Sequence, residues 1–147
     1  YNIGGSNEVP NIDIAKRLKP GGILLYNHHN YFAWNGHHCA PKKVEAIDLS
    51  DHGQRELVDW GHVSFDPPAE HYIARGLNRI RLDEIIALTE RYFNIETAEE
   101  RPSKPNTGLG RLTDEIRLAH PHLEDRDFET QNLFCIARVK PALDAQP

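Results

Sequence analysis

Histidine, asparagine and aromatic side chains are concentrated in residues 27–41, NHHNYFAWNGHHCAP, directly after an apolar run at 23–26. Imidazoles exchange protons near neutral pH, and amides can orient a hydroxyl or amide group of a ligand. We expect His28 and His29, which stand nearest to the apolar run, to be the catalytic bases. The expected substrate-binding residues, which supply amide, aromatic or imidazole groups, are Asn30, Tyr31, Trp34, Asn35, His37 and His38.

The same imidazoles, together with Cys39, are also suitable ligands for a first-row transition metal. Against this alternative, neighbouring side chains on an extended segment point to opposite sides, so His28 and His29 cannot easily share one ion. The chain also contains no H-x-x-x-H or C-x-x-C spacing. A metal-dependent enzyme built on these histidines is therefore an alternative, and no metal ligands are assigned.

The elements that must position these residues are indicated by the apolar pattern. An unbroken apolar run predicts a strand that is buried on both faces, and apolar residues at i, i+3, i+4 and i+7 predict a helix. A turn ends the first helix at Pro20-Gly21-Gly22. We expect helices at 12–18 (after a cap at Asn11), 82–92 and 113–119, a helical turn within 50–60 capped by Ser50, and strands at 23–26, 94–98 and 132–139.

The turn Leu18-Lys19-Pro20-Gly21-Gly22 before an apolar strand, followed by this order of elements, resembles the rear half of class I S-adenosylmethionine-dependent methyltransferases. The resemblance covers roughly 12–98 and 130–140. It implies an α/β fold with a doubly wound (Rossmann-like), mostly parallel sheet and an antiparallel last strand. It also implies S-adenosylmethionine as the cofactor, with the acceptor bound beyond the strand at 23–26.

The chain departs from that family where the cofactor would bind. It has no Gly-rich loop after a first strand, and Gly108-Leu109-Gly110 does not follow a strand. The cofactor-binding residues are therefore not assigned. We expect residues 1–147 to be a single or partial domain, incomplete at its amino-terminal side, with a long substrate loop at 27–80 and a second insertion at 99–130. The absence of any methionine agrees with a fragment.

The composition excludes several classes of function. The net charge of −5 and scattered Lys and Arg disfavour a nucleic-acid surface, and no apolar run is long enough to cross a bilayer. Two cysteines make no disulfide framework, so we expect a cytoplasmic protein. The leading hypothesis is methyl transfer to an oxygen or nitrogen nucleophile of a small polar molecule. The alternatives are the metal-dependent enzyme and a non-catalytic remnant that binds a partner, including a second copy, through its aromatic residues.

Overall fold

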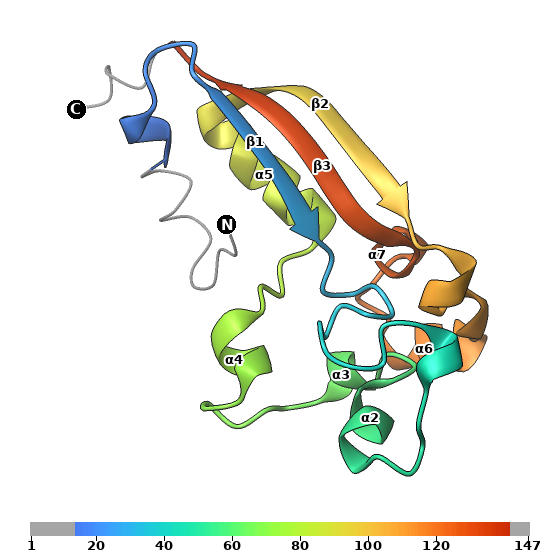
Figure 1. The fold of residues 1–147 in the computed structure, drawn as a ribbon. Helices are drawn as coiled ribbons and strands as arrows, with labels where there is room; N and C mark the ends of the chain where they lie inside the picture. Colours follow the sequence, from blue (N-terminus) through green and yellow to red (C-terminus); the bar gives the residue numbers. More distant parts are fainter. Residues whose placement is uncertain (1–13, 142–147) are drawn as a thin grey trace.

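Three strands form one antiparallel sheet in the computed structural model, which describes residues 14–141 (Figure 1). They are β1 (Ile23–His29), β2 (Phe93–Pro102) and β3 (Thr130–Val139), in the order β1-β3-β2. The last strand lies between the other two and is antiparallel to both. The expected doubly wound, mostly parallel sheet is therefore wrong. No two neighbouring strands of the described residues are parallel.

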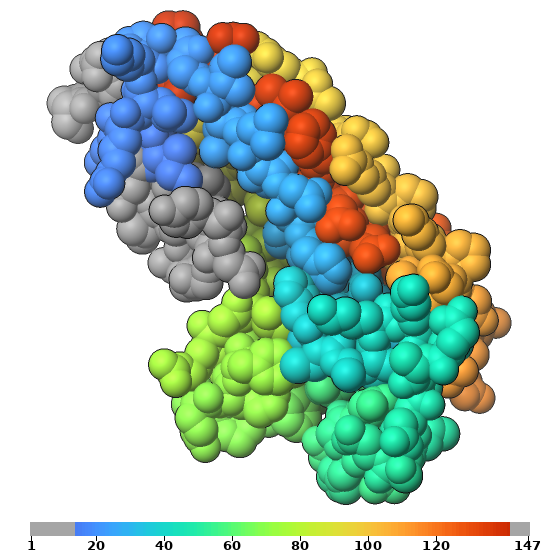
Figure 2. Space-filling model, viewed as in Figure 1, coloured from blue at the N-terminus to red at the C-terminus, as the bar shows by residue number. Residues whose placement is uncertain are grey.

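The parallel sheet was expected from the family resemblance, and the apolar run in β1 misled in the same direction. Four consecutive apolar residues are typical of a strand covered on both faces. In the structure, the alternate residues Ile23 and Leu25 are 52% and 61% exposed, so β1 is covered on one face only. Figure 2 shows β1, in blue, running along the outside of the molecule.

The helix α5 (Leu82–Tyr92) covers the other face of the sheet. Its apolar stripe was predicted with the observed bounds, and it places Leu82 and Ile85 against Leu133 of β3. Tyr26 of β1 reaches the same helix, where its hydroxyl lies 2.9 Å from Thr89 Oγ1. Because this Thr89 hydroxyl already donates to a backbone carbonyl within α5, Tyr26 is the donor and ties β1 to the helix.

The remaining predicted elements are present with shifted bounds. Residues 14–17 are helical, while the predicted cap Asn11 lies outside the described residues. Thr113 caps α6 (Asp114–Ala119). The turn expected at 50–60 is α2 (His52–Leu57), but its N-cap is Asp51, not Ser50. The shift that matters most is in β1, which continues three residues past 26 and ends at His29.

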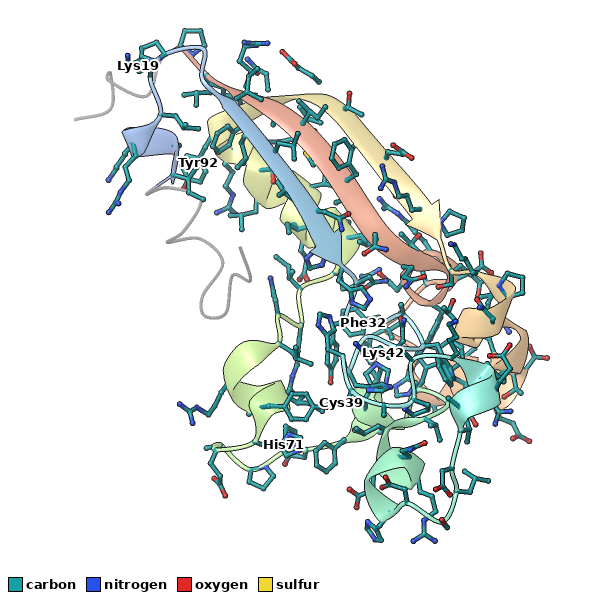
Figure 3. The ribbon with its side chains drawn as sticks, in the orientation of Figure 1. Lys19, Phe32, Cys39, Lys42, His71 and Tyr92 are labelled. Atoms are coloured by element: carbon teal, nitrogen blue, oxygen red, sulfur yellow. The ribbon has the colours of Figure 1, made fainter. Side chains whose placement is uncertain are left out.

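A second core lies beyond the ends of the strands, among short helices (Figure 3). Trp34 and Trp60 are fully buried there, and the Trp34 ring lies on the backbone of Gly108. A Cβ at Gly108 would stand 2.1 Å from Trp34 Cγ, so the segments 27–80 and 99–130 pack together. The other short helices are η1 (Val44–Ala46), α3 (Gly61–Ser64), α4 (Tyr72–Gly76), η2 (Pro105–Thr107), η3 (Leu109–Arg111) and α7 (Asp125–Glu129). None of the helices in the described residues is long and apolar enough to cross a membrane.

Candidate functional site

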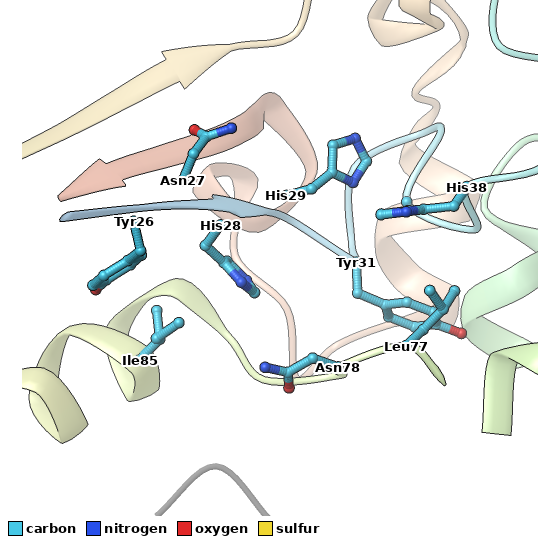
Figure 4. A pocket seen from close by; sticks show the side chains of 10 residues that line it. Tyr26, Asn27, His28, His29, Tyr31, His38, Leu77, Asn78 and Ile85 are labelled. Carbon is cyan, nitrogen blue, oxygen red and sulfur yellow. The ribbon is translucent and has the colours of Figure 1, made fainter. Parts of the chain in front are cut away.

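A small pocket lies at the carboxyl end of β1, between the sheet, the start of α5 and the loop that follows the strand (Figure 4). Its volume is about 60 Å³. The side chains and backbone that line it combine imidazole, amide, phenol and aliphatic groups, and they come from Tyr26, Asn27, His28, His29, Tyr31, Gly36, His38, Leu77, Asn78 and Ile85.

The extension of β1 to His29 places its two histidines on different walls of this pocket. Side chains alternate along a strand, and His28 points toward Asn78 while His29 points to the other side, toward His38 (Figure 4). The rings of His29 and His38 meet edge to face, with centroids 4.3 Å apart. The pocket is therefore lined by imidazole groups from both sides of the end of β1.

A tight turn returns the chain to the pocket after β1. The N–H of Gly36 donates to Ala33 O at 2.9 Å. A Cβ on Gly36 would stand 1.8 Å from Tyr31 O, so only glycine allows this close approach of two backbone segments. The turn brings His38, which has a positive φ of 62°, back to the end of β1.

The histidine nitrogens that face inward do not form hydrogen bonds with the protein. His28 Nε2 and His29 Nδ1 are buried, and neither has a partner among residues 14–141. Asn35 Oδ1 and His37 Nε2 are likewise buried and have no partner among the described residues. Buried polar atoms are nearly always hydrogen-bonded, so unpartnered nitrogens in a pocket wall indicate groups able to bind a ligand.

Burial keeps these imidazoles uncharged. Desolvation, with a smaller contribution from His38, lowers the pKa of both His28 and His29 from 6.5 to about 4. Desolvation and the neighbouring His62 lower the pKa of His37 to about 3. At neutral pH, His28 and His29 are therefore neutral rings, each with one donor and one acceptor nitrogen.

Four of the eight predicted site residues line the pocket: His28, His29, Tyr31 and His38. The structure places the others elsewhere. The Asn30 amide is fully engaged, since it donates to Asp127 O (2.6 Å) and Thr130 O (2.7 Å) and accepts from a backbone N–H. Trp34 is a core residue whose Nε1 donates to Asp59.

His37 and Asn35 also stand apart from the pocket lining. His37 is fully buried, and its Nδ1 accepts the N–H of Cys39 at 3.2 Å. Three aromatic residues follow β1, namely Tyr31, Phe32 and Trp34; all three are buried, and only Tyr31 reaches the pocket.

The sequence reasoning missed the wall formed by Leu77, Asn78 and Ile85. Ile85 belongs to the apolar stripe that predicts α5, and nothing in that stripe indicates a binding role. Leu77 and Asn78 follow α4 and have no spacing that relates them to the histidines. Only the fold brings this segment to the end of β1.

Within residues 14–141, no group of three His, Cys, Asp or Glu side chains is placed to hold a metal ion. The residues that line the pocket do not fit S-adenosylmethionine. The pocket volume of about 60 Å³ is far below the ~300–1,000 Å³ of pockets that enclose such ligands. The lining also contains no carboxylate to hold ribose hydroxyls.

Comparisons with known proteins add no family to this description. No family model, curated protein or solved structure matches the chain.

Proposed function

We propose that this chain binds the methyl acceptor of an S-adenosylmethionine-dependent methyltransferase and holds the reacting group of the acceptor against His28. The observation that carries the proposal is the pair of buried, unpartnered imidazole nitrogens in a pocket at the carboxyl end of β1. The turn at residues 18–22 and the order β1, α5, β2, β3 support the choice of methyl transfer, because the resemblance to that family rests on them.

The proposal assigns the acceptor, and not the donor, to these residues. Since the described residues do not fit S-adenosylmethionine, no residue of this chain is given a role in holding it. Binding the acceptor in a fixed orientation is itself a large part of catalysis in a two-substrate reaction, because it removes the entropy cost of a productive encounter.

The histidines are better suited to orient the acceptor than to remove its proton. A base is most effective when its pKa lies near the working pH, and the pKa of His28 and His29 is about 4. A neutral imidazole at this position can accept a hydrogen bond from a hydroxyl and fix the direction of the oxygen lone pairs. His28 is thus proposed to hold the nucleophile, with His29 on a different wall of the pocket.

The methyltransferase assignment is tested by calorimetric titration of the full-length natural polypeptide with S-adenosylhomocysteine. The proposal expects binding, and it expects His28→Ala to abolish methyl transfer while leaving the affinity for S-adenosylhomocysteine unchanged. His52→Ala is the matched control, because His52 is exposed and does not line the pocket. This variant should retain both methyl transfer and the affinity for S-adenosylhomocysteine. Absence of S-adenosylhomocysteine binding would overturn the proposal.

A further inference from the structure

We propose that the pocket at the end of β1 selects a hydroxyl group carried on an apolar body and rejects an ammonium group. This inference deepens the proposed function and rests on it for the role of the bound group, which would make the acceptor an oxygen nucleophile. The pocket chemistry itself is argued from the residues that line it.

The hydrogen-bonding capacity of the walls matches a hydroxyl. Each neutral imidazole presents its inward nitrogen, His28 Nε2 or His29 Nδ1, either as a donor or as an acceptor, depending on the tautomer. A hydroxyl donates one hydrogen bond and accepts others, so it satisfies either nitrogen in either state. An ammonium only donates, and it cannot satisfy a nitrogen that carries a proton.

The charges around the pocket act against a cation. No acidic side chain lines the pocket. Two cations of the described residues act on its walls: the Arg79 guanidinium lies 5.7 Å from the centroid of the Tyr31 ring, and Lys42 adds to the burial that lowers the pKa of His38. A buried ammonium would therefore lose its hydration without gaining a counter-charge.

The pocket also disfavours a positive charge on its own histidines. Protonation of His28 or His29 would place a cation in the pocket wall, and the pKa of each ring is lowered to about 4 because burial disfavours that cation. A ligand ammonium in the same space meets the same desolvation and the same neighbours.

The rest of the lining suits an apolar body next to the hydroxyl. Leu77 and Ile85 contribute aliphatic carbons, and Tyr26 and Tyr31 contribute ring faces. The Tyr26 hydroxyl is turned away to Thr89, and the Tyr31 hydroxyl donates to His62 O at 2.7 Å. Both phenols thus offer mainly their apolar surface to a ligand.

Benzyl alcohol and benzylammonium form a matched pair of probes, because they share one apolar body and differ in the polar group. We expect benzyl alcohol to shift the ring resonances of His28 and His29 saturably in NMR titrations of the full chain at pH 7. Benzylammonium should bind at least about tenfold more weakly. Equal or tighter binding of benzylammonium, or no binding of benzyl alcohol, would overturn the proposal.

Two variants locate the binding. His28→Phe should abolish the benzyl alcohol shifts, whereas His52→Phe, at a side chain that is 75% exposed, should leave them unchanged. Retained binding in His28→Phe would place the probe elsewhere and overturn the inference. If this variant does not fold, the matched probes on the unaltered chain still decide the question. Benzyl alcohol binding without S-adenosylhomocysteine binding would leave the pocket chemistry standing and remove methyl transfer; the reverse result would remove only the hydroxyl selectivity.

Discussion

Two sets of buried polar side chains lie close to the end of β1, and they differ in whether their hydrogen bonds are made. The bonded cluster comprises Asn30, His62 and Asp127, whose side chains form hydrogen bonds with other residues. The pocket imidazoles are His28 and His29, whose inward nitrogens have no partner within residues 14–141. Residue type alone does not separate these sets, since both contain histidine.

The bonded cluster connects segments that are distant in sequence. Asn30 joins the end of β1 to α7 and the start of β3. His62 Nε2 lies 2.8 Å from Tyr31 O, and Asp127 accepts from Arg81 Nη2 at 2.8 Å. These side chains fix the backbone that surrounds the pocket. In this region, completed hydrogen bonds mark the supporting structure. Open ones occur both in the pocket wall, at His28 and His29, and outside it, at Asn35 and His37, so an open nitrogen indicates a binding surface only where it lines the pocket.

Acidification is expected to produce the largest effect on stability, through the imidazoles that the fold keeps neutral. The folded pKa is about 4 for His28 and His29 and about 3 for His37, below the ordinary 6.5. Below pH 6.5 the unfolded chain therefore binds more protons than the folded chain. The contribution of the neutral rings to the free energy of unfolding is fully present above pH 6.5 and is lost as the pH falls toward 4. The loss by pH 5 is about 1–2 kcal/mol for each ring.

Urea unfolding at pH 7, 6 and 5 and constant ionic strength measures this loss. The double variant His28→Phe/His29→Phe should make the pH dependence clearly shallower. A free energy of unfolding that stays constant from pH 7 to pH 5 would contradict the depressed pKa values.

Asn30→Ala is expected to destabilise the fold by about 3 kcal/mol, because it leaves two buried carbonyls and one N–H without their partner. Equilibrium denaturation monitored by tryptophan fluorescence measures the change. Asn27→Ala is the matched control, since Asn27 is an exposed asparagine three positions earlier, within β1, and should alter stability by less than about 0.5 kcal/mol. A similar, small effect of both substitutions would remove the supporting role of the bonded cluster.

The local elements were largely predictable, because their signals lie in neighbouring residues. The apolar stripe of α5 was sufficient for its bounds, and apolar runs located β1 and β3. The sheet was not predictable in the same way. Its order depends on which strands pair, and the apolar run of β1 suggested two covered faces where the fold provides one.

The site was predicted in part for the same reason. His28 and His29 were identified by their place after an apolar run, which is a local feature. The role of Asn30 was not visible, because its partners Asp127 and Thr130 lie 97 and 100 residues further along the chain. Side chains that complete long-range hydrogen bonds look the same in a sequence as side chains left open for a ligand.

A matched pair of histidine substitutions separates the two sets directly. His62→Phe should cost about 1–3 kcal/mol, since the Tyr31 and Leu57 carbonyls both face the ring nitrogens of His62. His28→Phe should stay within about 1 kcal/mol of the unaltered chain, because it replaces an unpartnered buried nitrogen with carbon. Denaturation curves of both variants measure the difference, and a larger cost for His28→Phe than for His62→Phe would reverse the comparison.

His38→Ala should have the smallest effect on stability and a specific effect on the pocket. His38 is exposed, and its ring is one of the groups that lower the pKa of His29. The substitution should therefore raise the pKa of His29, as measured by an NMR pH titration of its ring protons. The pKa should still stay below 6.5, because burial is the larger cause of the shift. The His120 ring, whose neighbour is His122, serves as the internal control and should titrate as before. A return of the pKa of His29 to 6.5 would mean that His38, and not burial in the pocket wall, keeps His29 neutral.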